Sequence, residues 1–122
     1  MTIVKPILRI FDYDKAIDFY VHWLGFKIDW EHEFEPGTPK YLQVSMRDIL
    51  LHLSEHHGDG SPGLHLHIEE FEGLKAYHQQ LIDKKYKYNR PGLTVPFWNE
   101  NAITMTAIDP AGNRITFSEV IK

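Results

Sequence analysis

The sequence predicts an α+β fold built from two tandem βαβββ modules. The first observation behind this prediction is a repeat: the β-prone triplet Leu8-Arg9-Ile10, the acidic turn after it and a helix-like run all recur 58 positions later, beginning at Leu66-His67-Ile68. The second is that both copies keep the same order of β-prone and helical signals. The third is length, because 122 residues are typical of one domain. We therefore expect two halves that share or adjoin one core.

The first module is predicted from an acidic turn, a helical run and three β-prone runs. Asp12 or Asp14 can cap the helix, because their side chains accept hydrogen bonds from its first backbone amides. Apolar residues between 17 and 24 are spaced to form one helix face, and Gly25 is the expected stop. The strands expected in this module lie at 7–10, 26–30, 41–46 and 49–54.

The second module repeats these signals after a polar, turn-rich segment. This segment predicts a linker at 58–62 between module one, residues 1–57, and module two, residues 63–122, within a single domain. The run Asp109-Pro110-Ala111-Gly112-Asn113 predicts a tight turn, since Pro, Gly and Asn favour turn geometry. The elements expected in this module are strands at 64–68, 86–88, 103–108 and 114–120 and a helix at 73–84.

Charge and composition exclude several functional classes. The formal net charge is −4, whereas nucleic-acid binding usually needs a basic face. No apolar run approaches the roughly 20 residues that cross a bilayer, and the first residues lack a secretory signal. We therefore expect a cytoplasmic protein with neither nucleic-acid nor membrane partners. The chain has no cysteine, which removes disulfides and zinc–thiolate sites.

Three motifs carry a family resemblance. They are the opening segment 8–20, Leu24-Gly25-Phe26 and the closing segment 109–117 with its Asp-Pro-Ala-Gly-Asn turn. With the repeated modules, they resemble the glyoxalase / bleomycin-resistance / dioxygenase superfamily, also called vicinal oxygen chelate, over practically the whole chain. This resemblance implies a curved, cup-shaped mixed sheet with helices on its convex side. The superfamily includes lyases, isomerases, dioxygenases, thiol transferases and drug-binding proteins, so the fold alone does not define the function.

Two further segments resemble the bleomycin-resistance-like branch. They are Ser54-Glu55-His56-His57-Gly58-Asp59 and Pro96-Phe97-Trp98. The resemblance implies a non-catalytic protein that binds and sequesters a bleomycin-family antibiotic and so gives antibiotic resistance. Antibiotics of this class are cationic glycopeptides with a flat bithiazole and a metal-chelating head. A net negative charge suits such a cation.

The metal site of the superfamily is predicted to be dismantled in this chain. The resemblance places the four ligand positions at Lys5, His52, Gly63 and Thr116. Only His52 ligates a divalent ion well, because lysine is a cation, glycine has no side chain and a threonine hydroxyl is a poor ligand. We therefore expect no cofactor. Without the ion, the usual means of stabilising an enediolate-like intermediate is also lost.

An alternative keeps a divalent metal ion in a displaced histidine site. His65 and His67 alternate on one predicted strand and so face the same side. With His52 they form a possible metal site for a lyase, isomerase or dioxygenase. The other reading is that His65 and His67 line the pocket or are hydrogen-bonded within the core. No serine lies in a triad or nucleophile-elbow context, so no catalytic residue is predicted.

Aromatic residues near strand ends predict a ligand-binding cavity. Flat heteroaromatic groups and cations bind well against aromatic rings, at about 0.5–2 kcal/mol per contact. His52 and His65 are the predicted polar contacts. The predicted aromatic walls are Trp30, Phe34, Tyr41, Phe97 and Trp98.

We also expect a homodimer. A duplicated sheet of eight strands can curve only partly around a ligand, and its edges would be open unless they were paired or covered. In related proteins a twofold partner completes each cup, often by exchanging a segment. Twofold assembly is also the commonest oligomeric arrangement.

Overall fold

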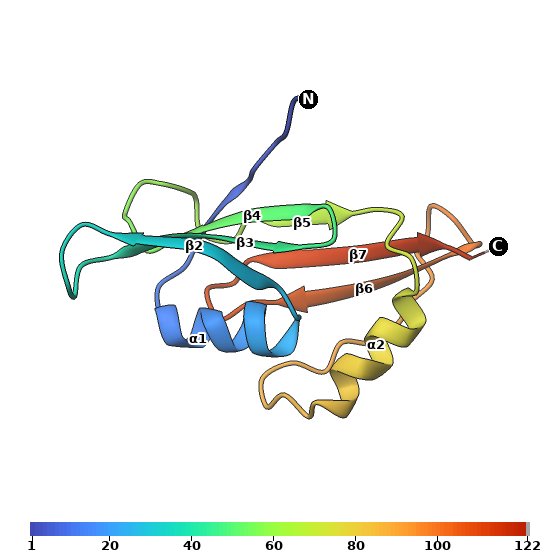
Figure 1. Ribbon diagram of the computed structural model, residues 1–122. Helices are drawn as coiled ribbons and strands as arrows, with labels where there is room; N and C mark the ends of the chain where they lie inside the picture. Colours follow the sequence, from blue (N-terminus) through green and yellow to red (C-terminus); the bar gives the residue numbers. More distant parts are fainter. Residues whose placement is uncertain (122) are drawn as a thin grey trace. The chain divides into compact units, whose positions relative to one another are not determined.

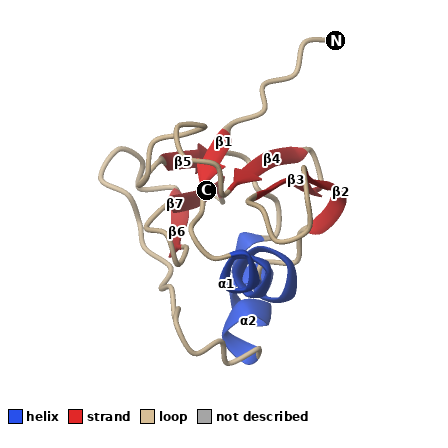
Figure 2. Ribbon diagram, turned by 90° about the vertical axis from the view of Figure 1, so that its left-hand side faces the viewer, coloured by secondary structure: helices blue, strands red, loops and turns tan. Residues whose placement is uncertain are grey.

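The computed structural model describes residues 1–121, which form two compact units. The first unit contains residues 1–64 together with the turn at 109–113, and the second contains residues 65–108 and 114–121. Each unit has one mixed sheet and one helical segment (Figures 1 and 2), so the predicted α+β class is confirmed. No helix in residues 1–121 has both the length and the apolar character required to span a bilayer.

The first unit has a four-stranded sheet in the order β1-β4-β3-β2. Strand β1 pairs with β4 in parallel, with Ile7 opposite His52, and the other two pairings are antiparallel. The order matches the predicted β-α-β-β-β sequence. Its elements are β1 (Ile7–Arg9), α1 (Tyr13–Ile17), η1 (Asp18–Trp23), β2 (Lys27–Glu33), β3 (Lys40–Met46) and β4 (Ile49–Ser54).

The second unit has a three-stranded sheet in the order β5-β7-β6, and α2 packs against β6 and β7. Its elements are β5 (His65–Ile68), α2 (Leu74–Asp83), β6 (Ala102–Ile108) and β7 (Arg114–Val120). The predicted strand at 86–88 is wrong. After α2 the chain turns at Lys85, which has φ 53°. The residue that pairs with β6 on its outer side is Thr94, which forms an isolated β-bridge with Thr104. A three-residue alternation was too short a signal to identify a strand.

The predicted start and end of the first helical segment are confirmed. The Asp12 carboxylate accepts a hydrogen bond from the Lys15 amide at 3.1 Å, and Gly25 takes φ 95° after the last turn. The segment Asp18–Trp23 is a π-helix, in which wider turns replace the α-helical spacing. Within it Phe19, Tyr20 and Trp23 are all buried. This helical segment lies against one face of the first sheet (Figures 1 and 2).

The two units share a helix-capping device. In the first unit, the Glu55 carboxylate after β4 accepts hydrogen bonds from the backbone amides of Tyr13 at 3.1 Å and Lys40 at 3.0 Å. In the second, the Glu119 carboxylate in β7 accepts from the amides of Gly73 at 3.1 Å and Leu74 at 3.0 Å. A carboxylate at a helix N-terminus satisfies free amides and complements the helix dipole. The duplication therefore extends to a tertiary contact that ties each sheet to its own helix.

The Asp109–Asn113 turn is held by a buried carboxylate. Asp109 is 4% exposed, and its Oδ1 accepts from the amides of Ala111 at 2.9 Å and Asn113 at 2.8 Å. Its Oδ2 accepts from the Tyr20 hydroxyl at 2.6 Å and from Asn113 Nδ2 at 2.9 Å. Burial and the neighbouring Asp109 charge raise the pKa of Tyr20. The predicted turn therefore also anchors the helical segment of the first unit.

Candidate functional site

One face of each sheet is apolar and packs in its unit's core, and the other face is polar. In the first unit Leu42 and Val44 are fully buried, whereas the alternate residues Tyr41, Gln43 and Ser45 of β3 point to the polar face. In the second unit the fully buried residues Ile115 and Phe117 alternate with Thr116 and Ser118. The predicted histidines belong to these polar faces, as do two of the five predicted aromatic walls, Trp30 and Tyr41. The other three walls, Phe34, Phe97 and Trp98, lie in loops.

In the first unit, three of the predicted site residues are in mutual ring contact. We call Trp30, Tyr41 and His52 the ring cluster. The Trp30 and Tyr41 rings are parallel to within 7°, with centroids 6.0 Å apart. The His52 ring meets both edge-on, with its centroid 5.3 Å from Trp30 and 5.1 Å from Tyr41. Trp30 is 43% exposed, so the cluster offers aromatic surface to solvent.

A β-bulge in β2 adds an acidic side chain next to this cluster. The pairing with β3 places Ile28 opposite Val44 and Trp30 opposite Gln43, so Asp29 is the extra residue. In a regular strand Asp29 and Trp30 would point to opposite faces, but a bulge re-aims side chains. Here Asp29 bonds to Gln43 and Ser45 while Trp30 stacks on Tyr41, so both occupy the polar face.

A chain of hydrogen bonds connects Asp29 to Tyr41. Asp29 Oδ2 accepts from Gln43 Nε2 at 2.9 Å, and Asp29 Oδ1 accepts from the Ser45 hydroxyl at 2.9 Å. Gln43 Oε1 lies 3.0 Å from His52 Nε2, and the Tyr41 hydroxyl lies 2.6 Å from His52 Nδ1. Both ring nitrogens of His52 are therefore engaged.

The environment of this chain shifts three pKa values. The hydrogen bond from Gln43 lowers the pKa of Asp29, with further lowering from Ser45 and Lys27 against an opposing effect of burial. Burial lowers the pKa of His52, and the charge of Lys5 acts in the same direction. Burial, followed by the charge of Asp59, raises the pKa of Tyr41. These shifts favour an ionised Asp29, a neutral imidazole and a neutral phenol.

Phe34 lies beyond β2 and makes its ring contacts with two other residues. Its ring is 4.6 Å from that of His32 and 5.9 Å from that of His56, edge-on in both cases. It is 74% exposed. The ring contacts of Phe34 are therefore with His32 and His56 and not with the ring cluster.

The second unit brings the other predicted residues together along β5, β7 and the loop before β6. His65 Nε2 lies 2.9 Å from the Thr116 hydroxyl, which in turn lies 2.8 Å from the Thr106 hydroxyl. His67 Nε2 lies 3.2 Å from the Ser118 hydroxyl. The Trp98 ring is 5.7 Å from His67, and the Phe97 ring is 5.3 Å from Trp98. Phe97 is 97% exposed and Trp98 56% exposed, so neither ring fills the core.

The four positions at which the family resemblance implies metal ligands do not form a suitable donor set. His52 has both nitrogens hydrogen-bonded, and the Thr116 hydroxyl is shared with His65 and Thr106. Gly63 offers no side chain, and lysine is a poor metal ligand while it is protonated. In the part of the chain that is described, no group of three or more His, Cys, Asp or Glu side chains is arranged to hold a metal ion.

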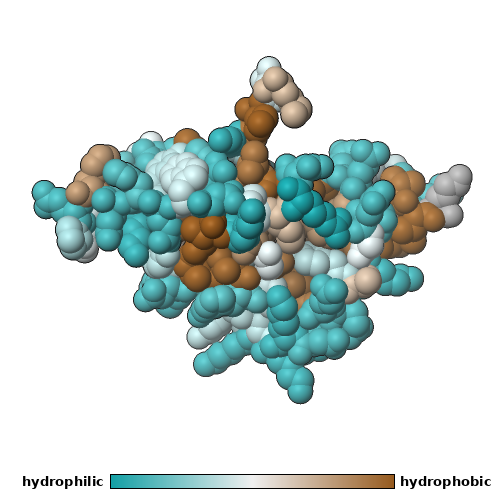
Figure 3. All heavy atoms as spheres, in the orientation of Figure 1, coloured by the Kyte–Doolittle hydropathy of each residue, from teal (hydrophilic) through white to brown (hydrophobic). Residues whose placement is uncertain are grey.

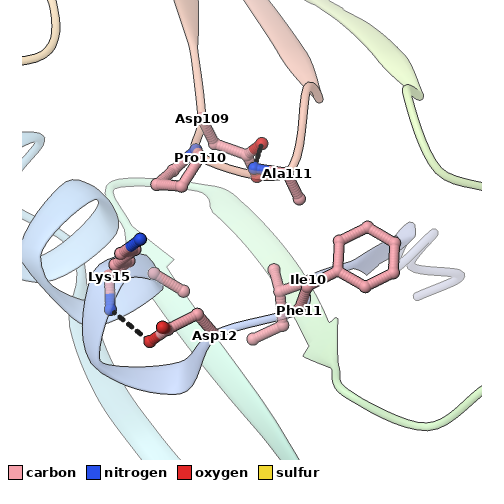
Figure 4. A pocket seen from close by; sticks show the side chains of 8 residues that line it. Ile10, Phe11, Asp12, Lys15, Asp109, Pro110 and Ala111 are labelled. Carbon is pink, nitrogen blue, oxygen red and sulfur yellow. Dashed lines mark hydrogen bonds between the residues drawn. The ribbon is translucent and has the colours of Figure 1, made fainter.

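A pocket of about 150 Å³ lies elsewhere in the first unit, between the start of α1 and the Asp109–Asn113 turn (Figure 4). It is smaller than the roughly 300–1,000 Å³ of pockets that hold drug-sized ligands. Its carboxylates are engaged locally, Asp12 with the Lys15 amide and Asp109 with the Ala111 amide (Figure 4). The lining residues, none of them a predicted site residue, are Ile10, Phe11, Asp12, Lys15, Ala16, Asp109, Pro110 and Ala111.

Sequence reasoning missed Asp29, Gln43 and Ser45. Uninterrupted alternation over 26–30 puts Asp29 on the face opposite Trp30, and only the bulge reverses this. Gln43 and Ser45 were predicted to lie in a strand, and their alternation with the apolar Leu42 and Val44 was a signal that they share a face with Tyr41.

The comparisons with known proteins agree with this architecture. Three similar solved structures are a bleomycin resistance determinant encoded on the transposon Tn5 (17% identity, 98% of each chain covered, TM-score 0.73), an antibiotic-binding protein from Streptomyces sp. CB03234 (23% identity, 98% of this chain and 97% of that chain, TM-score 0.72), and a bleomycin-binding protein complexed with bleomycin (16% identity, 98% of each chain, TM-score 0.71). At these identities the likeness shows the fold. No curated protein is a significant match to the chain.

The family comparison covers the whole sequence. A family model described as "Glyoxalase superfamily protein" matches residues 1–122. The fold, the tandem modules and this match agree, and the chain belongs to the glyoxalase superfamily.

Proposed function

We propose that the protein binds a small molecule without converting it, and that the ligand is a bleomycin-family antibiotic sequestered in the cytoplasm. The observation that carries the proposal is the ring cluster, where Trp30 is 43% exposed and stacks parallel to Tyr41 on a polar sheet face. Exposed aromatic rings of this kind suit flat heteroaromatic groups such as a bithiazole. The second unit adds the exposed rings of Phe97 and Trp98.

Charge supports a cationic ligand. The chain has a formal net charge of −4, and Asp29 places a carboxylate beside the ring cluster. Opposite charge speeds encounter and favours ligands of one sign. A cation above the face of Trp30 would gain about 0.5–2 kcal/mol.

Binding without chemistry is favoured over the metal-dependent alternative by the state of His52. In that alternative His52, His65 and His67 ligate a divalent ion. The two His52 nitrogens hydrogen-bond to Tyr41 and Gln43, so ligation would require one of these bonds to break. A hydrogen-bonded, neutral imidazole instead suits a polar wall of a binding site.

Bleomycin titration tests the proposal. We expect metal-free bleomycin to bind the purified protein at micromolar concentration by calorimetry, and Trp30→Ala and Trp98→Ala each to weaken binding roughly tenfold, because each removes one aromatic contact. Tyr88→Ala is the matched control. Tyr88 is 70% exposed and its ring contacts Tyr86, outside the predicted site, so its removal should leave the affinity unchanged.

Two results would contradict the proposal. The first is a protein that takes up no bleomycin, which would eliminate this ligand. The second is a stoichiometric transition metal, found by elemental analysis of untagged protein and lost from His52→Ala and His65→Ala proteins. That result would favour the metal-dependent alternative.

We also propose that the protein is a homodimer. The first residues project from β1 and display hydrophobic side chains (Figures 1 and 3), with Ile3 53% and Val4 83% exposed. A second copy would remove this apolar surface from water. We expect sedimentation equilibrium to give twice the chain mass of 14.3 kDa. A single-chain mass at micromolar concentration would refute the dimer.

A further inference from the structure

We propose that Asp29 sets the hydrogen-bond polarity of the ring cluster, so that the Tyr41 oxygen accepts and the cluster selects flat ligands bearing an N–H donor, such as an amidinium or a protonated amine. The inference rests on the proposed function, because it names the chemical group that the proposed site selects. It identifies Asp29 as a positioning residue, since its carboxylate acts on the ligand through Gln43, His52 and Tyr41.

The direction of the chain begins at the carboxylate. An ionised carboxylate only accepts hydrogen bonds. One Asp29 oxygen accepts a hydrogen bond from the Gln43 amide nitrogen at 2.9 Å, and the other accepts one from the Ser45 hydroxyl at 2.9 Å. The amide group of Gln43 is therefore held with its nitrogen toward Asp29 and its carbonyl oxygen toward His52.

The second step fixes the tautomer of His52. The Gln43 carbonyl oxygen, 3.0 Å from His52 Nε2, can only accept, so Nε2 carries the hydrogen. In a neutral imidazole the other nitrogen is then an acceptor. The Tyr41 hydroxyl oxygen lies 2.6 Å from His52 Nδ1, so the hydroxyl must donate a hydrogen bond to that nitrogen.

The third step reaches the ligand. Tyr41 has one hydroxyl hydrogen, and His52 takes it, so only lone pairs remain on the phenol oxygen. His52 has no free nitrogen to offer. A ligand group that approaches the Tyr41 oxygen must donate, and an acceptor there would meet lone-pair repulsion. The parallel ring of Trp30 supplies stacking surface for the flat body that carries this donor.

The polar face of the second unit shows what the carboxylate adds. His65, Thr116 and Thr106 are connected only through hydroxyl groups, at 2.9 and 2.8 Å. A hydroxyl both donates and accepts, so the direction of that series can reverse. The Asp29 chain cannot reverse while its carboxylate is ionised.

The tautomer of His52 provides the first test. Long-range ¹H–¹⁵N correlation spectra of the wild-type protein at about pH 8, above the usual imidazole pKa of about 6.5, should show His52 protonated on Nε2. The resonance is assigned by its loss in His52→Gln. In Asp29→Ala we expect a mixture of tautomers. A wild-type His52 protonated on Nδ1 would overturn the inference, and this readout does not depend on the folding of the Asp29→Ala protein.

Two aromatic cations provide the second test. Benzamidinium and phenyltrimethylammonium are both monocationic, but only benzamidinium donates N–H hydrogen bonds. We expect wild-type protein to bind benzamidinium about tenfold more tightly, since hydrogen bonds to charged groups are the stronger kind. The ratio should fall toward one in Tyr41→Phe, which keeps the ring, and in Asp29→Ala.

The control is Glu33→Ala, which removes one negative charge from the same strand and should keep the wild-type ratio. Glu33 is exposed in β2. Equal affinities of the two cations for the wild-type protein would refute the selectivity. If bleomycin binds but the ratio is one, this inference alone fails. If the ratio is tenfold but bleomycin does not bind, only the proposed antibiotic is wrong.

Discussion

Replacing Asp109 with alanine should destabilise the protein by about 3–5 kcal/mol, because it removes the acceptor for several buried donors at once. The carboxylate is 4% exposed and receives four hydrogen bonds from three residues. Alanine would leave the hydroxyl of Tyr20 and the amide of Asn113, both fully buried, without this partner. Urea unfolding monitored by tryptophan fluorescence measures the change, with the slope of the transition checked for constancy.

Tyr20→Phe separates one of these hydrogen bonds from the rest. It removes the hydroxyl 2.6 Å from Asp109 while keeping the ring and the turn's other bonds. We expect it to cost about 1.5–3 kcal/mol, the usual range for a hydrogen bond to a charged group. If Asp109→Ala cost no more than Tyr20→Phe, the turn's own hydrogen bonds would contribute nothing to stability.

Phe117→Ala should have a similarly large effect, about 3–5 kcal/mol, because it opens a cavity in the core of the second unit. Phe117 is fully buried in β7, and its ring lies 5.0 Å from Phe71 and 5.7 Å from Tyr77. The truncation therefore removes contacts to Phe71, which precedes α2, and to Tyr77 in the first turn of α2, as well as the buried area of the Phe117 ring. Thermal and urea unfolding measure the loss.

Phe97→Ala is the matched control for this truncation. The same side chain is removed, but Phe97 is 97% exposed and fills no core position. Surface substitutions usually stay within about 0.5 kcal/mol of the wild type. A stability loss at Phe97 comparable to that at Phe117 would show that the loop before β6 is structurally essential and would contradict its assignment as a ligand wall.

The features that the sequence predicted well are those that depend on local chemistry. Asp12 could be identified as a cap because a short acidic side chain before an apolar helical run has one obvious partner, the free amides of the first turn. Gly25 could be identified as a stop because it tolerates the positive φ of 95°. The 58-residue repeat predicted the two modules because the same apolar pattern demands the same burial.

The features that could not be predicted depend on the register of pairing. The bulge at Asp29 shifts one strand against its neighbour by one residue, and nothing in the composition of Lys27–Glu33 marks where this happens. Asp29, the acid that directs the hydrogen bonds of the ring cluster, was therefore not among the predicted site residues. At residues 86–88 the sequence has strand-like alternation, but these residues form no strand in the structure. Alternation alone does not show whether a neighbouring strand is available for pairing.

Strand β2 also affects the tendency of the protein to aggregate at high concentration. β2 is the outermost strand of the first sheet, all seven of its residues are exposed, and it carries Lys27, Glu31 and Glu33. Unpaired backbone groups on such a strand can recruit strands of other molecules, and charged side chains and bulges obstruct that recruitment. Neutralising these charges would thus remove a barrier to aggregation, even though none of the three is a predicted ligand contact.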